Sequence, residues 1–165
     1  MAETLSFQNV LDHLLDSKKD IPQGHLQHYS DLDPKSLRLF LDVWPSVKAD
    51  RKLLLLDKLL ANLETDNIVS YLDIGRALLD DSDSEVRARA IRLLAESDDP
   101  KLAGTLTQIL LTDTELAPRM EAANLLGEFI LLGELEKLPG SIQSQAEDAL
   151  ISIVRSENDS PALRK

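Results

Sequence analysis

The sequence predicts an all-α fold, an α-solenoid in which about three to four antiparallel helix pairs stack in a row and the last pair is incomplete. Apolar residues recur at helical spacing between turn formers along the chain, which is the first of two observations that favour this fold. The second is an internal repeat, because residues 74–96 match residues 106–128 at an offset of 32. A period between about 20 and 50 residues is typical of stacked repeats. The identical pairs are Leu78 and Leu110, Leu79 and Leu111, Asp81 and Asp113, Arg87 and Arg119, Ala90 and Ala122, Leu93 and Leu125, Leu94 and Leu126, and Glu96 and Glu128.

Composition excludes several classes of protein. The 165 residues are 43% hydrophobic, enough for one core of ordinary size, and they include no cysteine. Disulfide frameworks, thiol catalysis and cysteine-bound zinc are therefore excluded. The N-terminus lacks the pattern of a secretory signal and no long apolar run is present, so we expect a cytoplasmic protein that has no membrane partner.

The net charge argues against a nucleic-acid partner. Twenty-nine acidic residues outnumber 18 lysines and arginines, which gives a formal charge of −11 spread along the chain. Binding to duplex DNA depends on cations that neutralise phosphates. The best basic strip contains Arg87, Arg89 and Arg92, but Glu85 and Glu96 interrupt it, so we expect a basic or mixed partner and no nucleic acid.

The chain begins with an N-terminal segment, 1-33, that precedes the array. Residues 3–16 carry apolar side chains at helical spacing and predict an amphipathic helix. Turn formers dominate residues 17–33, which predicts a loop. The array is expected to span residues 34-165.

The first unit is predicted over residues 34-64. Asp33 is the expected cap of a helix that begins at Pro34 and ends before Pro45, and a long helix over 48–63 follows. The expected buried stripe of the first helix is Leu37, Phe40, Leu41 and Trp44. The second helix is expected to bury Leu53, Leu56, Leu59, Leu60 and Leu63 and to carry Arg51, Lys52, Asp57, Lys58 and Asn62 mostly on its exposed side.

The second unit is predicted over residues 67-97. Its first helix should cover 67–79, with Ile68, Leu72, Ile74, Leu78 and Leu79 on the apolar face. Ser82 and Glu85 form a predicted capping box, so the second helix should begin near Asp83. Its expected buried residues are Val86, Ala90, Leu93 and Leu94.

The third unit is predicted over residues 99-132. Asp99, followed by a proline, is the expected cap of its first helix. Pro118 lacks an N–H and cannot lie deep within the second helix, so the cap of that helix is expected at Thr114 or Ala117. The expected apolar residues are Leu102, Leu106, Ile109 and Leu110 in the first helix, and Met120, Ala123, Leu126, Phe129 and Ile130 in the second.

The fourth unit, 141-165, is expected to be incomplete. A helix over 141–156 should bury Ala146, Leu150, Ile153 and Val154. Ser160 to Arg164 then resemble the opening of another second helix, but the sequence stops at Lys165. We therefore expect either a truncated array or an apolar flank that another chain covers, which includes possible self-association.

Helix pairs of this length, with an aspartate before the second helix and an arginine within it, resemble HEAT repeats. The resemblance is clear over residues 67–132, weaker over 34–64 and partial over 141–165. It implies that the second helices line a concave surface and that the aspartates and arginines form a structural ladder. The ladder residues would be Asp81, Arg87, Asp113 and Arg119. Two departures are that Arg51 fits the ladder only with the leucines out of register, and that Pro118 replaces a small or apolar residue.

No catalytic, cofactor-binding or metal-binding residue is predicted, and no cofactor. His25 and His28 lie with Asp31 and Asp33 in an expected loop, without a full set of metal ligands. The acidic run over 80–85 lacks the glycine and the bidentate glutamate of a calcium loop. Phosphate-binding glycine loops, nucleophile elbows and metalloprotease motifs are absent.

The leading interpretation is a non-catalytic scaffold or adaptor that binds another protein through the concave face of its second helices. The candidate partner-binding residues are Arg89, Arg92 and Glu96 in one unit and Glu121, Asn124 and Glu128 in the next. Any solvated helix face also carries mixed charge, so a plain surface is the competing interpretation. Trp44 is interpreted as a core residue rather than a partner anchor.

Two further functions stay open at this point. HEAT proteins include lyases that attach chromophores to phycobiliproteins, so a phycobilin lyase or lyase subunit is the enzymatic alternative. The family also includes DNA glycosylases, but six aromatic residues do not supply the aromatic-lined basic groove that such an enzyme needs. The last alternative is a structural N-terminal segment of a longer repeat array.

Overall fold

The computed structural model describes residues 5–156 and 159–164, and within these ranges it contains helices and turns but no strand. The predicted all-α class is confirmed. The α-helices are α1 (Phe7–Leu15), α2 (Gln23–Leu26), α3 (Pro34–Val43), α4 (Ala49–Thr65), α5 (Leu72–Ala77), α6 (Ser84–Arg92), α7 (Lys101–Thr112), α8 (Leu116–Glu134) and α9 (Gly140–Arg155). Two short 3-10 helices are η1 (Gln27–Tyr29) and η2 (Trp44–Ser46).

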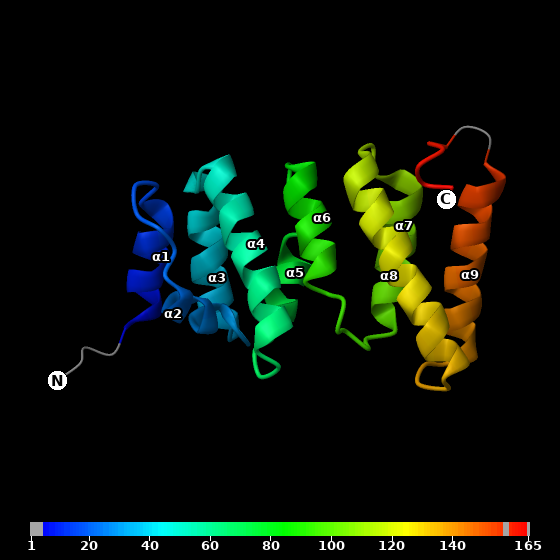
Figure 1. Cartoon of the computed structure of the whole chain (residues 1–165), viewed down its shortest axis with the longest axis horizontal. Coiled ribbons are helices and arrows are strands. Elements are labelled where there is room, and N and C mark those ends of the chain that lie inside the picture. Colours follow the sequence, from blue (N-terminus) through cyan, green and yellow to red (C-terminus); the bar gives the residue numbers. More distant parts are fainter. Residues whose placement is uncertain (1–4, 157–158, 165) are drawn as a thin grey trace.

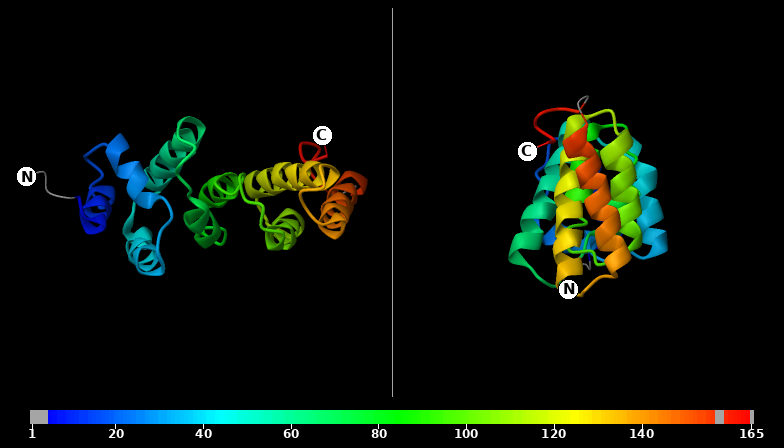
Figure 2. Two further views of the ribbon diagram at one scale, coloured as in Figure 1. Left: turned by 90° about the horizontal axis from the view of Figure 1, so that it is seen from below. Right: turned by 90° about the vertical axis from the view of Figure 1, so that its right-hand side faces the viewer.

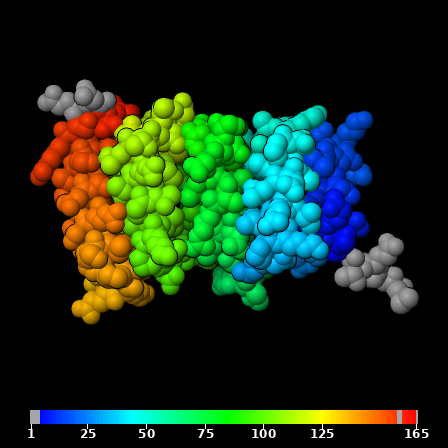
Figure 3. Space-filling model, turned by 180° about the vertical axis from the view of Figure 1, so that it is seen from behind, coloured from blue at the N-terminus to red at the C-terminus, as the bar shows by residue number. Residues whose placement is uncertain are grey.

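The helices stack in chain order along one axis (Figure 1). Seen from below, α3, α5 and α7 form one layer and α4, α6 and α8 form the other (Figure 2). The helices of the second layer run in the same direction, and α6 packs against both α4 and α8. From behind, successive segments appear as successive slabs (Figure 3). The predicted α-solenoid of antiparallel pairs is therefore confirmed.

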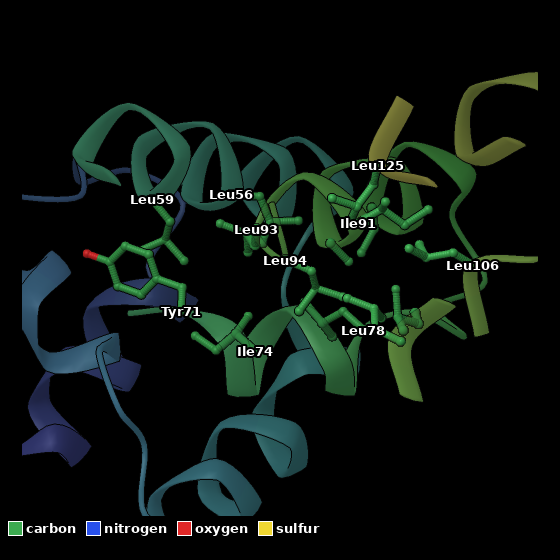
Figure 4. Packing of buried hydrophobic residues seen from close by; sticks show 14 of the residues in the cluster. Leu56, Leu59, Tyr71, Ile74, Leu78, Ile91, Leu93, Leu94, Leu106 and Leu125 are labelled. Atoms are coloured by element: carbon green, nitrogen blue, oxygen red, sulfur yellow. The ribbon is translucent and has the colours of Figure 1, made fainter. Parts of the chain in front are cut away.

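One hydrophobic core runs through the array. In Figure 4, side chains from α4, α5 and α6 meet those of α7 and α8 between the two layers. Positions that repeat at an offset of 32 fill equivalent places in successive units, and removing their apolar surface from water stabilises the stack. The identical repeated positions that are buried in both units are Leu78, Ala90, Leu93 and Leu94, and Leu110, Ala122, Leu125 and Leu126.

The N-terminal segment packs onto the first unit and joins the same core. The sequence predicts a loop over 17–33, but α2 and η1 lie there. Leu26 and Tyr29 are buried, and the Tyr71 hydroxyl donates a hydrogen bond to the Leu26 carbonyl at 3.2 Å. A helix this short is unstable alone, so tertiary contacts that have no local pattern explain the difference.

An aromatic chain links α1 to η2. The ring centroids of Phe7 and Tyr29 are 5.9 Å apart, and those of Tyr29 and Phe40 are 6.0 Å apart, both in edge-to-face geometry. Phe40 and Trp44 follow at 4.9 Å. Such pairs add stabilisation beyond their buried area. The interpretation of Trp44 as a core residue agrees with its burial.

Arg51 is buried, although the sequence places it on the exposed side of α4. Its side chain is held by three backbone carbonyls, with Nη2 2.8 Å from His13 O, Nε 2.8 Å from Leu14 O and Nη1 2.6 Å from Lys19 O. These carbonyls lie at the C-terminal end of α1 and in the turn after it. Carbonyls at a helix end lack partners within the helix and carry partial negative charge, so a cation is stabilised there.

Asn62 is the second polar residue of α4 that is buried against expectation. Its amide nitrogen donates to the Tyr71 hydroxyl at 2.8 Å, and its amide oxygen accepts from Gln23 at 2.6 Å. Because all three groups find partners, the cost of burying them is offset. Asn62 thereby ties α2 and the start of α5 to α4.

α5 is shorter than the helix predicted over 67–79, and Ile68 is 91% exposed. The backbone just before α5 is hydrogen-bonded to a distant turn rather than within a helix. Ser70 N–H donates to the Ser30 hydroxyl at 2.8 Å, and Ser70 O accepts from Asp31 N–H at 2.9 Å. These bonds to a distant turn replace the helical ones that the local pattern predicts.

Gly75 allows α5 to lie close against α6. A Cβ atom at this position would lie 2.7 Å from Leu94 Cδ2 and 3.0 Å from the Ala90 carbonyl oxygen. The contact with the carbonyl is tight and involves backbone, which cannot move as a side-chain tip does. The short first helix of the second unit is therefore held by a close approach.

Helix caps differ in detail from prediction. Asp83, not Ser82, caps α6, and its carboxylate accepts from Glu85 N–H at 2.8 Å. α8 is preceded by Glu115, with no side-chain cap bond, rather than by the predicted threonine or alanine. Pro118 is then the third helical residue, where no intrahelical N–H bond is lost.

The predicted cap of α3 is confirmed, because the Asp33 carboxylate accepts from two N–H groups at the start of that helix. α7 begins one residue later than predicted, so Pro100 and not Asp99 is its N-cap, although the Asp99 carboxylate accepts from Lys101 N–H at 3.0 Å. Besides Ile68, three residues expected on apolar faces are exposed instead: Leu41, Met120 and Val154. The last two border a flank of α8 and α9 that no helix of the described residues covers.

Candidate functional site

The predicted ladder residues lie between successive units. Nε and Nη2 of Arg87, in α6, each donate to the Asp113 carboxylate at 2.8 Å, and Nη1 donates to the Asp81 carbonyl at 2.8 Å. In the next unit, the Arg119 guanidinium of α8 bonds the Asp159 carboxylate. A two-point bond between a guanidinium and a carboxylate fixes both distance and direction. These contacts set the spacing of the second helices.

The first unit uses a lysine at the equivalent place. Lys52 Nζ lies 3.7 Å from the Asp81 carboxylate and 5.0 Å from the centroid of the Trp44 ring. Trp44 Nε1 donates to the same carboxylate at 2.7 Å. A cation over an indole face is stabilised by the negative charge of the ring. Lys52, not Arg51, is therefore the ladder base of the first unit.

Charge strengthens the contact between Arg87 and Asp113, which we call the rung between α6 and α8. Burial by itself would raise the pKa of Asp113, but hydrogen bonds from Arg87 and from Glu115 N–H, with the charges of Arg87 and Arg119, outweigh it. The pKa of Asp113 therefore lies below its ordinary value. The hydrogen bond to Asp113 in turn raises the pKa of Arg87.

A hollow of about 390 Å³ opens on the face of the second helices, and we call it the second-helix groove. α4, α6 and α8 each contribute to its lining. Its apolar members are mostly buried or half-buried and form a floor, whereas its polar members stand around them. The floor contains Leu60, Leu63, Ile91, Ala95 and Leu125, and the rim contains Glu64, Arg92, Glu96, Glu121, Asn124 and Glu128.

The charged rim of the second-helix groove has no internal ion pairs. Among the residues that the structure describes, no rim carboxylate lies within salt-bridge distance of a cation, and Arg92 has no acidic partner. These side chains therefore keep their charge available to a binding partner.

A family profile for HEAT repeats matches residues 73–165, more than half of the chain. The chain belongs to the HEAT-repeat family. No curated protein and no solved structure matches it. HEAT repeats generally act as scaffolds for protein interactions, which directs attention to the surfaces of this HEAT-repeat array.

Five of the six predicted partner-binding residues line the second-helix groove of the HEAT array, and the sixth, Arg89, does not. Arg89 Nε lies 2.7 Å from Asp57 of α4, and its Nη1 lies 2.7 Å from Glu85. The pKa of Arg89 is raised, first by its hydrogen bond to Asp57. Arg89 therefore joins α6 to α4.

The contribution of α4 to the groove was not predicted. Leu60 and Glu64 lie 32 residues before Arg92 and Glu96, so the same offset that relates the second and third units also points to them. The signal was hidden because this offset aligns Arg87 with Leu55, whereas the ladder base Lys52 lies 35 residues before Arg87. Leu63 completes the part that α4 supplies.

Other hollows of the HEAT array have a different character. The largest, about 700 Å³, lies between α5 and α7 on the side of the first helices. Most of its charges are already paired, since Arg76 lies 3.3 Å from Asp99, Arg87 is bound to Asp113 and Lys52 lies near Asp81. A third hollow, of about 320 Å³, lies between α8, α9 and Leu163. Size alone therefore does not identify the site.

Neither a metal-ligand cluster nor a helix able to span a membrane is found in the part of the chain that the structure describes. Within residues 5–156 and 159–164, no three histidine, cysteine or acidic side chains gather as metal ligands would. His25 lies instead against His13, with ring centroids 4.8 Å apart in edge-to-face geometry. None of the helices in the described ranges is both long and apolar enough to cross a bilayer.

Proposed function

We propose that this HEAT-repeat protein is a non-catalytic scaffold or adaptor that binds another protein in the second-helix groove. One observation supports the proposal most directly. Three successive second helices supply apolar and charged side chains to one hollow, and the charged ones are not paired with each other. Interfaces commonly combine an apolar centre with a polar rim, and the groove has both.

The shape of the groove favours a polypeptide over a small molecule. It is open to solvent and extends across three helices of a stacked array. Stacked repeats form extended surfaces of this kind, and an apolar side chain set into such a floor commonly contributes much of the binding energy.

A steric block would test the proposal. Proteins retained by the full chain from a lysate of its source organism would be identified, purified and titrated calorimetrically against the wild type. Ala95→Trp fills the groove, whereas Thr105→Trp places the same bulk on the exposed side of α7. We expect Ala95→Trp to weaken binding at least about tenfold and Thr105→Trp to leave it within about twofold. Equal affinity of both variants would reject the groove as the binding site.

We also propose the division of the array into units 34-64, 67-97, 99-132 and 141-165, preceded by the segment 1-33. The helix pairs α3 and α4, α5 and α6, and α7 and α8 support the first three units, and α9 supports the last. Deletion of residues 1-33 should lower the urea midpoint, because the described part of that segment covers the outer side of the first unit. An unchanged midpoint would argue against this role.

Self-association through the C-terminal flank is a second candidate function. A difference in exposure between equivalent residues of successive units favours it. Ala88 of α6 is 6% exposed, but Met120, its counterpart 32 residues later, is 39% exposed, and Val154 of α9 is 60% exposed. We propose that a second copy of the chain covers this apolar surface. Light scattering over a range of concentrations should detect a dimer that Val154→Glu disrupts; a wild type that is monomeric at high concentration would exclude this.

A further inference from the structure

The floor of the second-helix groove is apolar and reachable from solvent. Leu60 and Leu63 of α4 are half-buried, and Ile91 and Leu125 lie beneath the opening. Covering such a floor with an apolar side chain removes both surfaces from water. An occupant of the groove therefore needs at least one apolar side chain that points into it.

The rim specifies the charge of that occupant. Its charged members are four glutamates and one arginine, a formal charge of −4 + 1 = −3. Glu64, Glu96 and Glu128 lie at successive intervals of 32 residues, and they come from α4, from the turn directly after α6 and from α8. Because α4, α6 and α8 pack side by side and all three glutamates line the groove, we treat the three as a row across the stack.

The row also specifies a spacing. Packed helices lie about 8–10 Å apart, so neighbouring glutamates of the row come from backbones separated by about that distance. A polyproline II segment has three residues per turn and a rise of about 3.1 Å per residue, so every third side chain lies on one face at intervals of about 9 Å. A whole helix is about 10–12 Å across and would have to sit above a hollow of about 390 Å³ rather than within it.

Building on the function proposed above, we infer that the groove takes an extended segment with lysine or arginine at every third position and apolar residues between them. The segment runs along the stack and crosses α8, α6 and α4. Its cations meet Glu64, Glu96 and Glu128, and an apolar side chain enters the floor between Leu60 and Leu125. Because Arg92 lies on α6, the middle helix of the three, an acidic residue near the centre of the segment would suit it.

Matched peptides test this inference. The probes are fluorescent ten-residue peptides with lysine at every third position and leucine or proline between, the same peptide with glutamate for lysine, and a scrambled peptide of identical composition. Fluorescence anisotropy with the full wild-type chain measures their affinities. We expect the regular lysine peptide to bind at least about fivefold more tightly than the scrambled one, with affinity falling as salt is raised. The glutamate peptide should not bind.

Protein variants locate the binding. Glu64→Gln, Glu96→Gln and Glu128→Gln together should weaken the lysine peptide at least about tenfold. The control combines Asp42→Asn, Asp80→Asn and Asp148→Asn, which removes three exposed carboxylates outside the groove. It should change affinity less than about twofold. Equal losses in the two triple variants would overturn the inference, because only the overall charge would then matter.

Two results separate this inference from the proposed function. If Ala95→Trp abolishes binding of a natural partner but the glutamate triple variant does not, the groove binds proteins and the basic segment is wrong. If neither change affects that partner, both proposals fall. A helical peptide with lysine at every seventh position that binds more tightly than the extended one would overturn the extended conformation.

Discussion

Arg51 is a buried cation that has no carboxylate among its partners. Three backbone carbonyls near the end of α1 hold its guanidinium, and they fix the N-terminal helix onto α4. Sequence patterns could not predict this contact, because backbone carbonyls are the same in every residue and leave no mark on the sequence. The sequence pattern therefore places Arg51 with the other polar residues of α4, on the exposed side of the helix.

Arg51→Met should destabilise the protein by about 3 kcal/mol, because three charge-assisted hydrogen bonds are lost and their carbonyls stay buried. Urea unfolding followed by circular dichroism measures this. Arg38→Met, at an exposed position of α3, is the control and should cost less than about 0.5 kcal/mol. Similar losses in both variants would contradict the role of Arg51.

His25 should make stability depend on pH. Burial lowers the pKa of His25 below 6.5, and the charges of His13 and His28 lower it further. The unfolded chain then binds the proton more readily than the folded one, so stability is lost as pH falls through about 6.5. The urea midpoint should fall between pH 7.5 and 5.5, and it should fall less in His25→Gln. An equal fall in both proteins would assign the effect to other groups.

The second helices were easier to predict than the first helices. Arg87, Ala90, Leu93, Leu94 and Glu96, in α6 and the turn after it, recur 32 positions later in α8, so each segment supports the prediction of the other. α5 has no such support, and bonds from Ser70 to a turn 40 residues earlier shorten it. The groove residues of α6 and α8 could be predicted for the same reason. The groove residues of α4 could not, because the repeat diverges in the first unit.

Substitutions of glycine by alanine should have opposite effects in α5 and α7. Gly75→Ala should destabilise by about 1–3 kcal/mol, because the new methyl group would press on the Ala90 carbonyl and on Leu94. Gly104 is an exposed helical residue whose nearest neighbour, Gln145 Nε2, would lie 3.7 Å from a Cβ. Gly104→Ala should therefore stabilise by about 0.5–1 kcal/mol. Thermal or urea unfolding distinguishes the two signs.

The rung between α6 and α8 should show energetic coupling. In a double-mutant cycle of Arg87→Met and Asp113→Asn, we expect a coupling energy of about 1–3 kcal/mol, since both side chains are largely buried. The exposed pair of Lys19 and Asp16 is the control and should couple by less than about 0.5 kcal/mol. A negligible coupling for Arg87 and Asp113 would show that packing alone sets the spacing of the second helices.

The two ends of the array are built differently. At the N-terminal end, α1 and α2 cover the first unit with buried side chains and with the bonds of Arg51. At the other end, α8 and α9 expose apolar side chains, and their rung depends on the Asp159 carboxylate. The stack was predictable from the repeat, but the N-terminal cover was not, because it lies outside the repeat.

Acid should therefore loosen the C-terminal units first. The hydrogen bond from Arg119 lowers the pKa of Asp159, and the pKa of Asp113 is also below its ordinary value. The pKa values of Asp16, Asp20 and Asp33 at the N-terminal end are lowered as well, but the bonds of Arg51 to backbone carbonyls there do not titrate in acid. Carboxylates of this kind stabilise the fold at neutral pH, and that stabilisation is lost as pH falls below about 3.8. Hydrogen exchange at pH 2.5, corrected for intrinsic rates, should show α8 and α9 losing protection before α1 and α4. The reverse order would contradict this.

The bond from Trp44 to Asp81 has a practical consequence for anyone who studies the chain in solution. The protein has a single tryptophan, and its indole lies where the first and second units meet. All indole emission from the molecule thus originates at that one joint. The wavelength and intensity of this emission report whether the first and second units stay packed together. No added label is needed, and no other tryptophan contributes to the signal.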